Sequence, residues 1–487
     1  MISFIAAFLH GTAAPARGHQ AVRAGFVAVC AAFAAGFLVF PTYPVYDSYY
    51  ALLWGREILD GRLPEFDGFR VPTQHPLAIA AGTVLSLLGD VAERVWIALV
   101  LASLLWLVWG VYRLAAEATT TLVGVVAAVL VLTRFDLGFL AARGYVDVPY
   151  IALVVWAAVL EQRRPRRGAA VFALLGAAGL LRPEAWVLAA LYWLRMAWSA
   201  PWRARVGDAV LAAAAPALWV LTDLVATGDP LFSLLHTSGS AEDLGRRRSL
   251  AELPAAVPAF LENILKRPVL LAAVAGVAVG VAMAPRRLLM PLVLLATGLG
   301  TFAAIAAAGL SVIERYLTVT AVALTVFAAV AVAGWTMLAP SRLRTAWMAC
   351  AGVLAAAGAA YTAANLDLTR FEGELRFRGE AHAALEDVLR SGATAAALRC
   401  GPLTVPNHKL VPDARWILDL PAGAVQPRAD PRTRPTDGPE LFATSRLAVV
   451  RHAFTNRADP ATIQVPATTH VRASTSPHYA VYVRPGC

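Results

Sequence analysis

Long apolar runs, interrupted by short clusters of arginine, most strongly limit how this chain can fold. A membrane-spanning helix needs about 20 predominantly apolar residues, and runs of this kind recur between residues 24 and 364. Hydrophobic residues make up 59% of the 487 residues and charged residues only 15%, whereas soluble domains average about 25% charged. The pattern predicts an α-helical polytopic membrane protein with about eleven transmembrane helices.

The arginine clusters indicate which side of the membrane each loop occupies. The net charge of +10 comes from short clusters between apolar runs, such as RRPRR at 163–167. Loops rich in lysine and arginine stay in the cytoplasm. This rule predicts a cytoplasmic N-terminal tail at 1–23 and a first outer loop at 42–75. The expected location is the cell (plasma) membrane, and this placement of the charge argues against nucleic-acid binding.

The composition changes near Asn365, where the long apolar runs stop. We expect a transmembrane domain over 24–364 and an extracytoplasmic α/β domain over 365–487, at the C-terminus. Within the second domain, the segment RFRGEAHAALEDVLRSG predicts an amphipathic helix, and the Pro-rich piece 421–439 predicts a loop. The segments ARWILDL (414–420), SRLAVVRH (445–452) and HYAVYVR (478–484) predict strands.

Two of the four cysteines, Cys400 and Cys487, lie in this C-terminal domain. Disulfides form and persist in oxidising compartments outside the cytoplasm. If the domain is exported, a disulfide between these two cysteines would fix the end of the chain. The alternative is two free thiols.

Charged residues gather at the predicted outer boundary of the membrane, where each is a candidate functional group. Asp47 comes shortly after the first apolar run, and Tyr46 and Tyr50 flank it. These tyrosines could stack on a sugar or form an interfacial belt. The other candidates come from three further segments: Asp136, Arg143, Asp147, Arg182, Glu184, Glu314, Arg315 and Tyr316.

These residue types suit a substrate with an anionic head and a lipid tail. Arginine forms bidentate pairs with phosphate oxygens, so Arg143, Arg182 and Arg315 are candidate phosphate ligands. A carboxylate close to them, such as Asp47, can accept a proton from an attacking hydroxyl.

Four segments carry a resemblance to a known family. They are YPVYDSYYALLWGREILDGRLP (43–64), TQHPL (73–77), LLRPEAW (180–186) and ERYL (314–317). With the layout of the apolar runs, they resemble the GT-C superfamily of integral-membrane glycosyltransferases. The closest resemblance is to members that use polyprenyl-phosphate-linked sugars, such as protein mannosyltransferases and aminoarabinose transferases.

The resemblance implies that Asp47 is the catalytic base. His75 could contact the phosphate of the donor, or it could be a turn residue, because a proline follows it. Many members carry a second acid beside the first, but here Asp47 is followed by Ser48. No metal is therefore assigned, a divalent metal stays open, and the assisting carboxylate could be Asp67, Asp136 or Asp147. The HPL sequence also replaces the commoner His-Pro-Pro.

The resemblance implies an inverting glycosyltransferase that moves a monosaccharide from a polyprenyl phosphate to a hydroxyl of a cell-envelope glycan, lipid or protein. Mannose and arabinose are the first sugars to consider. Two other functions remain open at this stage. One is a flippase or transporter for a lipid-linked sugar, which should show broken helices and mid-membrane polar residues. The other is a non-catalytic GT-C-like subunit that binds lipid.

Overall fold

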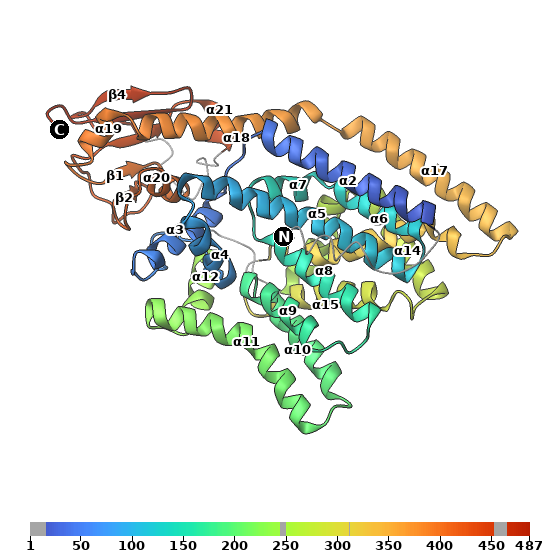
Figure 1. The fold of residues 1–487 in the computed structure, drawn as a ribbon. Helices are drawn as coiled ribbons and strands as arrows, with labels where there is room; N and C mark the ends of the chain where they lie inside the picture. Colours follow the sequence, from blue (N-terminus) through green and yellow to red (C-terminus); the bar gives the residue numbers. More distant parts are fainter. Residues whose placement is uncertain (1–15, 244–249, 311, 452–464) are drawn as a thin grey trace. The chain divides into compact units, whose positions relative to one another are not determined.

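A computed structural model describes residues 16–243, 250–310, 312–451 and 465–487 (Figure 1). The chain divides into two compact units, residues 1–40 and residues 41–487. The described part of the first unit is helix α2 (Ala16–Val39), whose segment Gln20–Val39 is a candidate membrane span. All other elements belong to the second unit.

Each apolar run expected to cross the membrane is helical. Besides α2, these helices are α5 (Ala92–Ala118), α6 (Thr121–Leu132), α8 (Asp147–Arg163), α9 (Ala169–Leu181), α10 (Glu184–Ala197), α11 (Trp202–Thr227), α14 (Arg267–Met283), α15 (Leu289–Ala307), α16 (Thr318–Ala333) and α17 (Arg342–Asn365).

The number of helices that can span a membrane is smaller when length is considered. Within the described residues, six helices are long and apolar enough, or up to eight if each of two sharply bent pairs is one span. The expected number was about eleven. The difference arises partly because α9 and α10 contain only 13 and 14 residues, or roughly 20 Å of helix each. The predicted class, a polytopic helical protein with a C-terminal α/β domain, is confirmed.

Helix α16 is the most buried of the candidate spans, with 89% of its apolar window buried inside the protein. The neighbouring helices α14 and α15 approach α16 closely because each has a glycine at the contact. A methyl group on Gly276 of α14 would overlap the backbone of Phe327, and one on Gly298 of α15 would crowd Thr320. Small residues allow this kind of backbone approach between membrane helices. The core of the helical part therefore lies around α16.

Two shorter helices follow the first unit and carry much of the predicted site. They are α3 (Tyr46–Leu59) and α4 (Pro76–Ser86), which cross where Gly55 and Gly82 face each other's backbone. Helix α4 has 11 residues, too short to span a membrane, as expected for an interfacial or re-entrant piece. The remaining elements here are α7 (Phe135–Ala142), α12 (Phe232–Asp243), α13 (Leu253–Leu265), and the 3₁₀ helices η1 (Gly89–Val91), η2 (Leu250–Glu252), η3 (Glu314–Leu317) and η4 (Gly334–Met337).

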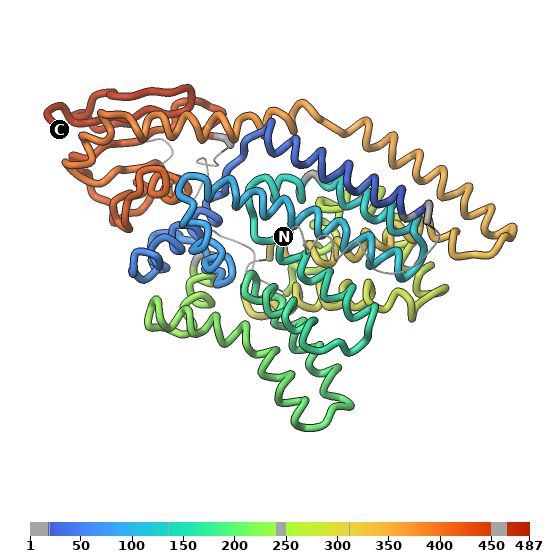
Figure 2. Tube along the Cα trace, viewed as in Figure 1, coloured from blue at the N-terminus to red at the C-terminus, as the bar shows by residue number. Residues whose placement is uncertain are grey.

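The C-terminal domain is a five-stranded sheet with helices packed against it. The strand order is β2-β1-β3-β5-β4, in which β1 is parallel to β2 and β3 while β5 is antiparallel to β3 and β4. Figure 2 shows this domain, in orange and red, beside α3 in blue. Its elements are α18 (Leu368–Leu389), α19 (Gly392–Ala397), β1 (Leu403–Val405), η5 (His408–Leu410), α20 (Val411–Ile417), β2 (Val425–Pro427), β3 (Glu440–Ala443), α21 (Arg446–Arg451), β4 (Val471–Thr475) and β5 (Tyr479–Val483).

The structure confirms two of the predicted elements of this domain, since 478–484 contains β5 and the amphipathic segment lies in α18. Two predicted strands are wrong. Residues 414–417 end helix α20, which begins near Pro412, a favoured residue in a first helical turn. Residues 446–451 form α21, where the Ser445 hydroxyl accepts a hydrogen bond from the Ala448 amide at 3.0 Å. The last predicted residue, His452, lies outside the described residues. The expected loop contains the short strand β2.

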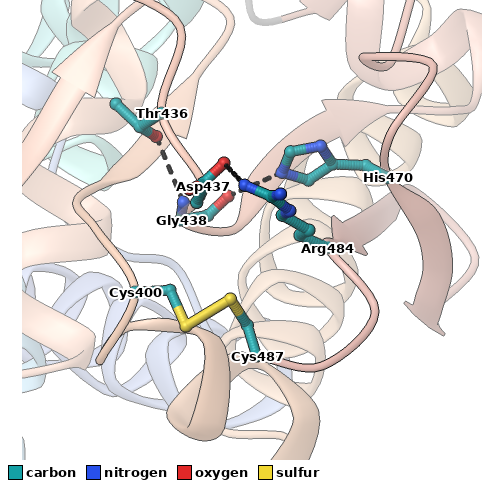
Figure 3. The surroundings of a disulfide bond; sticks show 7 residues. All are labelled: Cys400, Thr436, Asp437, Gly438, His470, Arg484 and Cys487. Atoms are coloured by element: carbon teal, nitrogen blue, oxygen red, sulfur yellow. Dashed lines mark hydrogen bonds and ion pairs between the residues drawn. A yellow bond between two sulfur atoms is a disulfide. The ribbon is translucent and has the colours of Figure 1, made fainter.

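A disulfide joins Cys400 and Cys487, whose Cα atoms are 6.0 Å apart (Figure 3). Close by, Arg484 pairs with Asp437, and the His470 ring donates a hydrogen bond to the carbonyl of Gly438 at 3.1 Å. The disulfide attaches the last residues of the chain to the segment before β1, and the Arg484–Asp437 pair attaches them to the loop before β3.

Candidate active site

Five chain segments bring charged side chains together at their helix ends. Asp47 lies in the first turn of α3, Asp147 begins α8, and Glu184 begins α10. Carboxylates are favoured at helix N-termini because of the positive end of the helix dipole. We call the following set the Asp47 cluster: Asp47, His75, Asp147, Arg182, Glu184, Arg315 and Tyr316.

Arg182 belongs to the cluster and pairs with two of its carboxylates. Its Nη1 lies 2.6 Å from Oδ1 of Asp147, and its Nη2 lies 2.9 Å from Oε1 of Glu184. The guanidinium also lies 5.0 Å from the centre of the Tyr316 ring. A buried charge must be paired to be tolerated, and Arg182 is only 6% exposed. The trio of Arg182, Asp147 and Glu184 carries one positive charge against two carboxylates.

Asp47 is not part of this trio of ion pairs. Burial raises the pKa of its carboxyl above the usual value, the nearby positive charge of Arg315 opposes that rise, and Asp147 reinforces it. A carboxyl with a raised pKa accepts a proton more readily at neutral pH. Its neighbour Tyr145, between α7 and α8, has a raised pKa because of burial and the charge of Asp47.

Arg315 differs from Arg182 in lacking a carboxylate partner. Among the described residues it forms no ion pair, and its buried Nε has no hydrogen-bond partner. Its electrostatic neighbours are Asp147, Arg182 and Asp47, and its side chain also approaches the ring of Tyr316. The guanidinium of Arg315 therefore has N–H donors that could bind an anion from outside the cluster, such as a ligand.

His75 lies directly before α4, with its ring 5.9 Å from that of Trp219. Burial and the positive charge of Arg182 lower its pKa to about 3, so the imidazole is neutral at physiological pH. Its Nδ1 is buried and has no hydrogen-bond partner within the described part of the chain. The preceding residue, Gln74, donates to Asp223 of α11 at 3.1 Å, which fixes the approach of this loop.

A cavity of about 310 Å³ opens beside the cluster, and Arg315 belongs to its wall. Asp136, Arg143 and Glu314 also line it, together with Arg134. The rest of the wall is largely apolar: Val131, Leu137, Phe139, Leu140, Ile264, Leu265, Thr318, Ala321, Val322 and Thr325. Such a surface suits a molecule that is partly anionic and partly hydrocarbon.

Three of the charged residues in this wall already have partners, since Arg134 donates from Nη1 to the carbonyl of Ile264 at 2.6 Å. Arg143 pairs with Glu374 of α18 at 3.2 Å, and Glu314 accepts a hydrogen bond from Asn263 at 2.6 Å. Arg315 is therefore the residue that links the Asp47 cluster to the cavity while keeping its donors free of carboxylates.

The sequence-predicted residues thus fall into three groups. Seven form the Asp47 cluster, and Asp136, Arg143 and Glu314 line the adjacent cavity. Tyr46 directly precedes Asp47, and its hydroxyl donates to the carbonyl of Arg70 at 3.4 Å. Tyr50 is only 3% exposed and packs against Tyr46 and Trp54. Tyr50 therefore lies in the core of this region rather than beside an open site.

Several residues near the site were not anticipated from the sequence. Tyr145 lies two residues before Asp147, and Arg134 lies two residues before Asp136, so proximity to a predicted acid was the available signal. Asp223 carried no such signal, because it lies inside the apolar helix α11. A lone acid within an apolar run is itself a reason to look for a partner.

The fold and the arrangement of helix ends define a class: a polytopic helical membrane protein with a C-terminal α/β domain and charged side chains gathered at its helix ends. Among solved structures, the chain is similar to ArnT from Cupriavidus metallidurans bound to undecaprenyl phosphate. The identity is 15% and the TM-score 0.58, over 95% of this chain and 98% of that chain. The apo state of the same ArnT gives 14% identity and a TM-score of 0.54, with the same coverage.

At this identity the similarity establishes the fold, and the expected GT-C architecture is confirmed. No protein-family model matches the sequence, and no curated protein does.

Proposed function

We propose that the protein is a glycosyltransferase that moves a monosaccharide from a polyprenyl phosphate to a hydroxyl acceptor. In this proposal the reaction takes place on the extracytoplasmic face of the plasma membrane, and α3 and the C-terminal domain would lie on that face. The acceptor is a cell-envelope glycan, lipid or protein. Mannose and arabinose are the sugars to test first.

One observation carries this proposal. Arg315 has no carboxylate partner among the described residues, its charge acts on Asp47, and it lines a largely apolar cavity. The phosphate of a lipid-linked sugar would bind Arg315, because guanidinium groups form strong charge-assisted bonds with phosphate oxygens. The hydrocarbon chain would follow the apolar wall. The sugar attached to that phosphate would then lie on the side of Asp47.

The chemistry follows from this placement. Asp47 takes the proton of the acceptor hydroxyl, and that oxygen attacks the anomeric carbon of the donor. The new glycosidic bond forms as the bond between the anomeric carbon and the phosphate oxygen breaks. The phosphate leaves with the bonding electrons, and Arg315 stabilises its charge. A single displacement of this kind inverts the anomeric configuration.

Arg182 has a positioning role in this scheme, because its guanidinium is already occupied by Asp147 and Glu184. Of the three carboxylates considered as assistants to Asp47, Asp147 is the one that affects its pKa. Asp67 and Asp136 are exposed. The neighbouring structure of ArnT bound to undecaprenyl phosphate supports a polyprenyl phosphate as the lipid.

The test uses purified protein in nanodiscs, supplied with radiolabelled polyprenyl-phosphate mannose or arabinose and a cell-envelope extract. Transfer by the wild type should fall by about 10²–10⁴-fold in Asp47→Asn, while Asp67→Asn, which removes an exposed acid from the same loop, should retain activity. Equal transfer by wild type and Asp47→Asn would reject Asp47 as the base. Lipid movement across the bilayer without transfer would identify a flippase, and saturable donor binding alone would identify a lipid-binding subunit.

A further inference from the structure

A second group of polar side chains, which includes His408 and Arg70, contacts Tyr46, the residue before Asp47. His408 comes directly after strand β1 and the Pro406–Asn407 turn. Its ring centre lies 5.6 Å from that of Tyr46 and 6.3 Å from that of Phe69. The C-terminal domain therefore contributes a side chain to the immediate surroundings of the residue that precedes Asp47.

His408 is only 7% exposed, and its Nδ1 has no hydrogen-bond partner among the described residues. A buried polar atom without a partner costs free energy, so its retention requires an explanation. Burial, followed by the positive charges of Lys409 and Arg70, lowers the pKa of His408 to about 3. The neutral ring thus has two positively charged side chains near it.

Arg70 shows the same signs of an unsatisfied site. Its buried Nη1 has no partner among the described residues. Its backbone φ is 52°, a left-handed conformation that non-glycine residues rarely adopt. Strained residues of this kind persist where the surrounding structure holds them, often at ligand sites. The carbonyl of Arg70 accepts the Tyr46 hydroxyl at 3.4 Å, which ties this strained turn to α3.

The sheet topology places His408 where ligands commonly bind. Strand β1 is parallel to both β2 and β3, and His408 follows its carboxyl end. Ligands of open α/β sheets bind outside the carboxyl ends of parallel strands. Asn407, which is 1% exposed, accepts a hydrogen bond from the amide of Lys409 at 3.0 Å and fixes this turn.

We propose that Arg70 and His408 form a subsite for an anionic group, a phosphate or carboxylate, on the acceptor. Arg70 would donate from Nη1 and His408 from Nδ1, while Tyr46 and Phe69 would cover the sugar ring that bears the anion. The acceptor role rests on the proposed glycosyltransferase function. In that setting the subsite lies beside Asp47, so a bound anion would orient a neighbouring hydroxyl toward the base.

The test measures binding of glycerol 3-phosphate, with glycerol as the neutral counterpart, by saturation-transfer NMR on the full chain in phosphatidylcholine nanodiscs. All proteins carry Arg315→Gln, so that phosphate binding at the donor site does not contribute. Glycerol 3-phosphate should bind and glycerol should not. Arg70→Gln and His408→Gln should each weaken binding by about tenfold or more, whereas Arg472→Gln, an exposed arginine of the same domain, should have no effect.

A replacement with the opposite effect keeps the proposal testable if His408→Gln folds poorly. His408→Arg adds a permanent charge and should tighten phosphate binding. Glucuronate measured against glucose distinguishes a carboxylate from a phosphate acceptor. Absence of glycerol 3-phosphate and glucuronate binding, or equal losses in Arg472→Gln and Arg70→Gln, would overturn the proposal.

The two proposals fail in different ways. In one outcome, phosphate binding depends on Arg70 and His408, but Asp47→Asn leaves transfer unaffected. The anion subsite then stands, and the proposal that it positions an acceptor for Asp47 is wrong. If transfer requires Asp47 while Arg70→Gln and His408→Gln leave both transfer and phosphate binding unchanged, the subsite is wrong and the enzyme stands.

Discussion

The guanidinium of Arg415 lies 2.5 Å from the carboxylate of Glu57, although 358 positions separate the two residues in the sequence. Arg415 belongs to α20 of the C-terminal domain, and Glu57 belongs to α3, whose first turn carries Asp47. Arg56 of α3 adds a second link by donating to the Arg415 carbonyl at 3.0 Å. The C-terminal domain is thus bonded directly to the helix that carries the candidate base.

Removing one member of this pair should strongly destabilise the protein. Arg415→Ala leaves the Glu57 carboxylate buried without its main partner, and we expect the free energy of unfolding to fall by about 3–5 kcal/mol. Thermal unfolding of the purified protein in nanodiscs measures the effect. The control is Arg432→Ala, which breaks an ion pair whose arginine side chain is 71% exposed, and it should cost less than about 1 kcal/mol. Equal losses would contradict the assignment.

Arg315 should control the binding of the lipid phosphate. Arg315→Gln removes the charge from the cavity wall, and the dissociation constant of undecaprenyl phosphate should rise by about 10–100-fold. Arg315→Lys, which keeps the charge but not the bidentate geometry, should have an intermediate effect. Tryptophan fluorescence titration in nanodiscs provides the measurement. If Arg267→Gln, at an arginine whose side chain is 76% exposed, weakens binding as much, a specific role for Arg315 is excluded.

The crossing of α3 and α4 should not tolerate a side chain at Gly82. A methyl group there would overlap the backbone of Ala51, so Gly82→Ala forces the two helices apart at an expected cost of about 1–3 kcal/mol. Because α3 carries Asp47, transfer activity should fall as well. Gly176→Ala is the matched control, since this glycine of α9 has nothing within 4 Å of the added methyl. A larger loss of stability in the control would refute the packing argument.

Asp413 should make the stability of the protein depend on pH. Burial, reinforced by the charge of Glu93, raises its pKa to about 8, while Arg378 opposes the shift. An acid whose pKa is higher in the folded state stabilises that state at low pH, and this contribution disappears as the pH rises through the folded pKa. The buried histidines act in the opposite sense and below pH 6.5, because the pKa of His382 falls to about 4.

Over the window between pH 6.5 and pH 8, the difference between the wild type and Asp413→Asn therefore measures the contribution of Asp413. We expect the wild type to lose about 1 kcal/mol of stability across it, and Asp413→Asn to lose much less. Denaturant unfolding, followed by far-ultraviolet circular dichroism at both pH values, provides the comparison. Parallel pH profiles for the two proteins would show that another group is responsible.

The disulfide should stabilise the C-terminal domain by closing a long segment of chain. Cys400 and Cys487 are separated by 87 positions, and removal of such a bond costs about 2–5 kcal/mol. The double variant Cys400→Ser/Cys487→Ser should unfold at a lower temperature than the wild type under non-reducing conditions. The difference should vanish once a reductant is added. A difference that persists in reductant would mean that the serines themselves disturb the packing.

Much of the architecture could be predicted from the sequence, because the signals are local. Apolar length and turn residues predicted the helices that form the membrane part, including the α9–α10 hairpin around Pro183. Carboxylates at helix beginnings, such as Asp47 and Asp147, marked the residues that the fold brings together. One wrong prediction concerns residues 414–417, which have the composition of a strand. In the structure they end helix α20, where the Arg415 side chain pairs with Glu57. Propensity is a weak prior that tertiary contacts override.

The sequence by itself determined that this protein is helical, embedded in a membrane, and polar at the ends of its helices. It did not determine which arginine is paired with carboxylates and which has N–H donors available to a ligand. Arg182 is held by Asp147 and Glu184, whereas Arg315 forms no ion pair among the described residues. That difference depends on distances of a few ångströms between segments far apart in the chain. Only the tertiary packing of the helices sets those distances, and with them the place where an anion can bind.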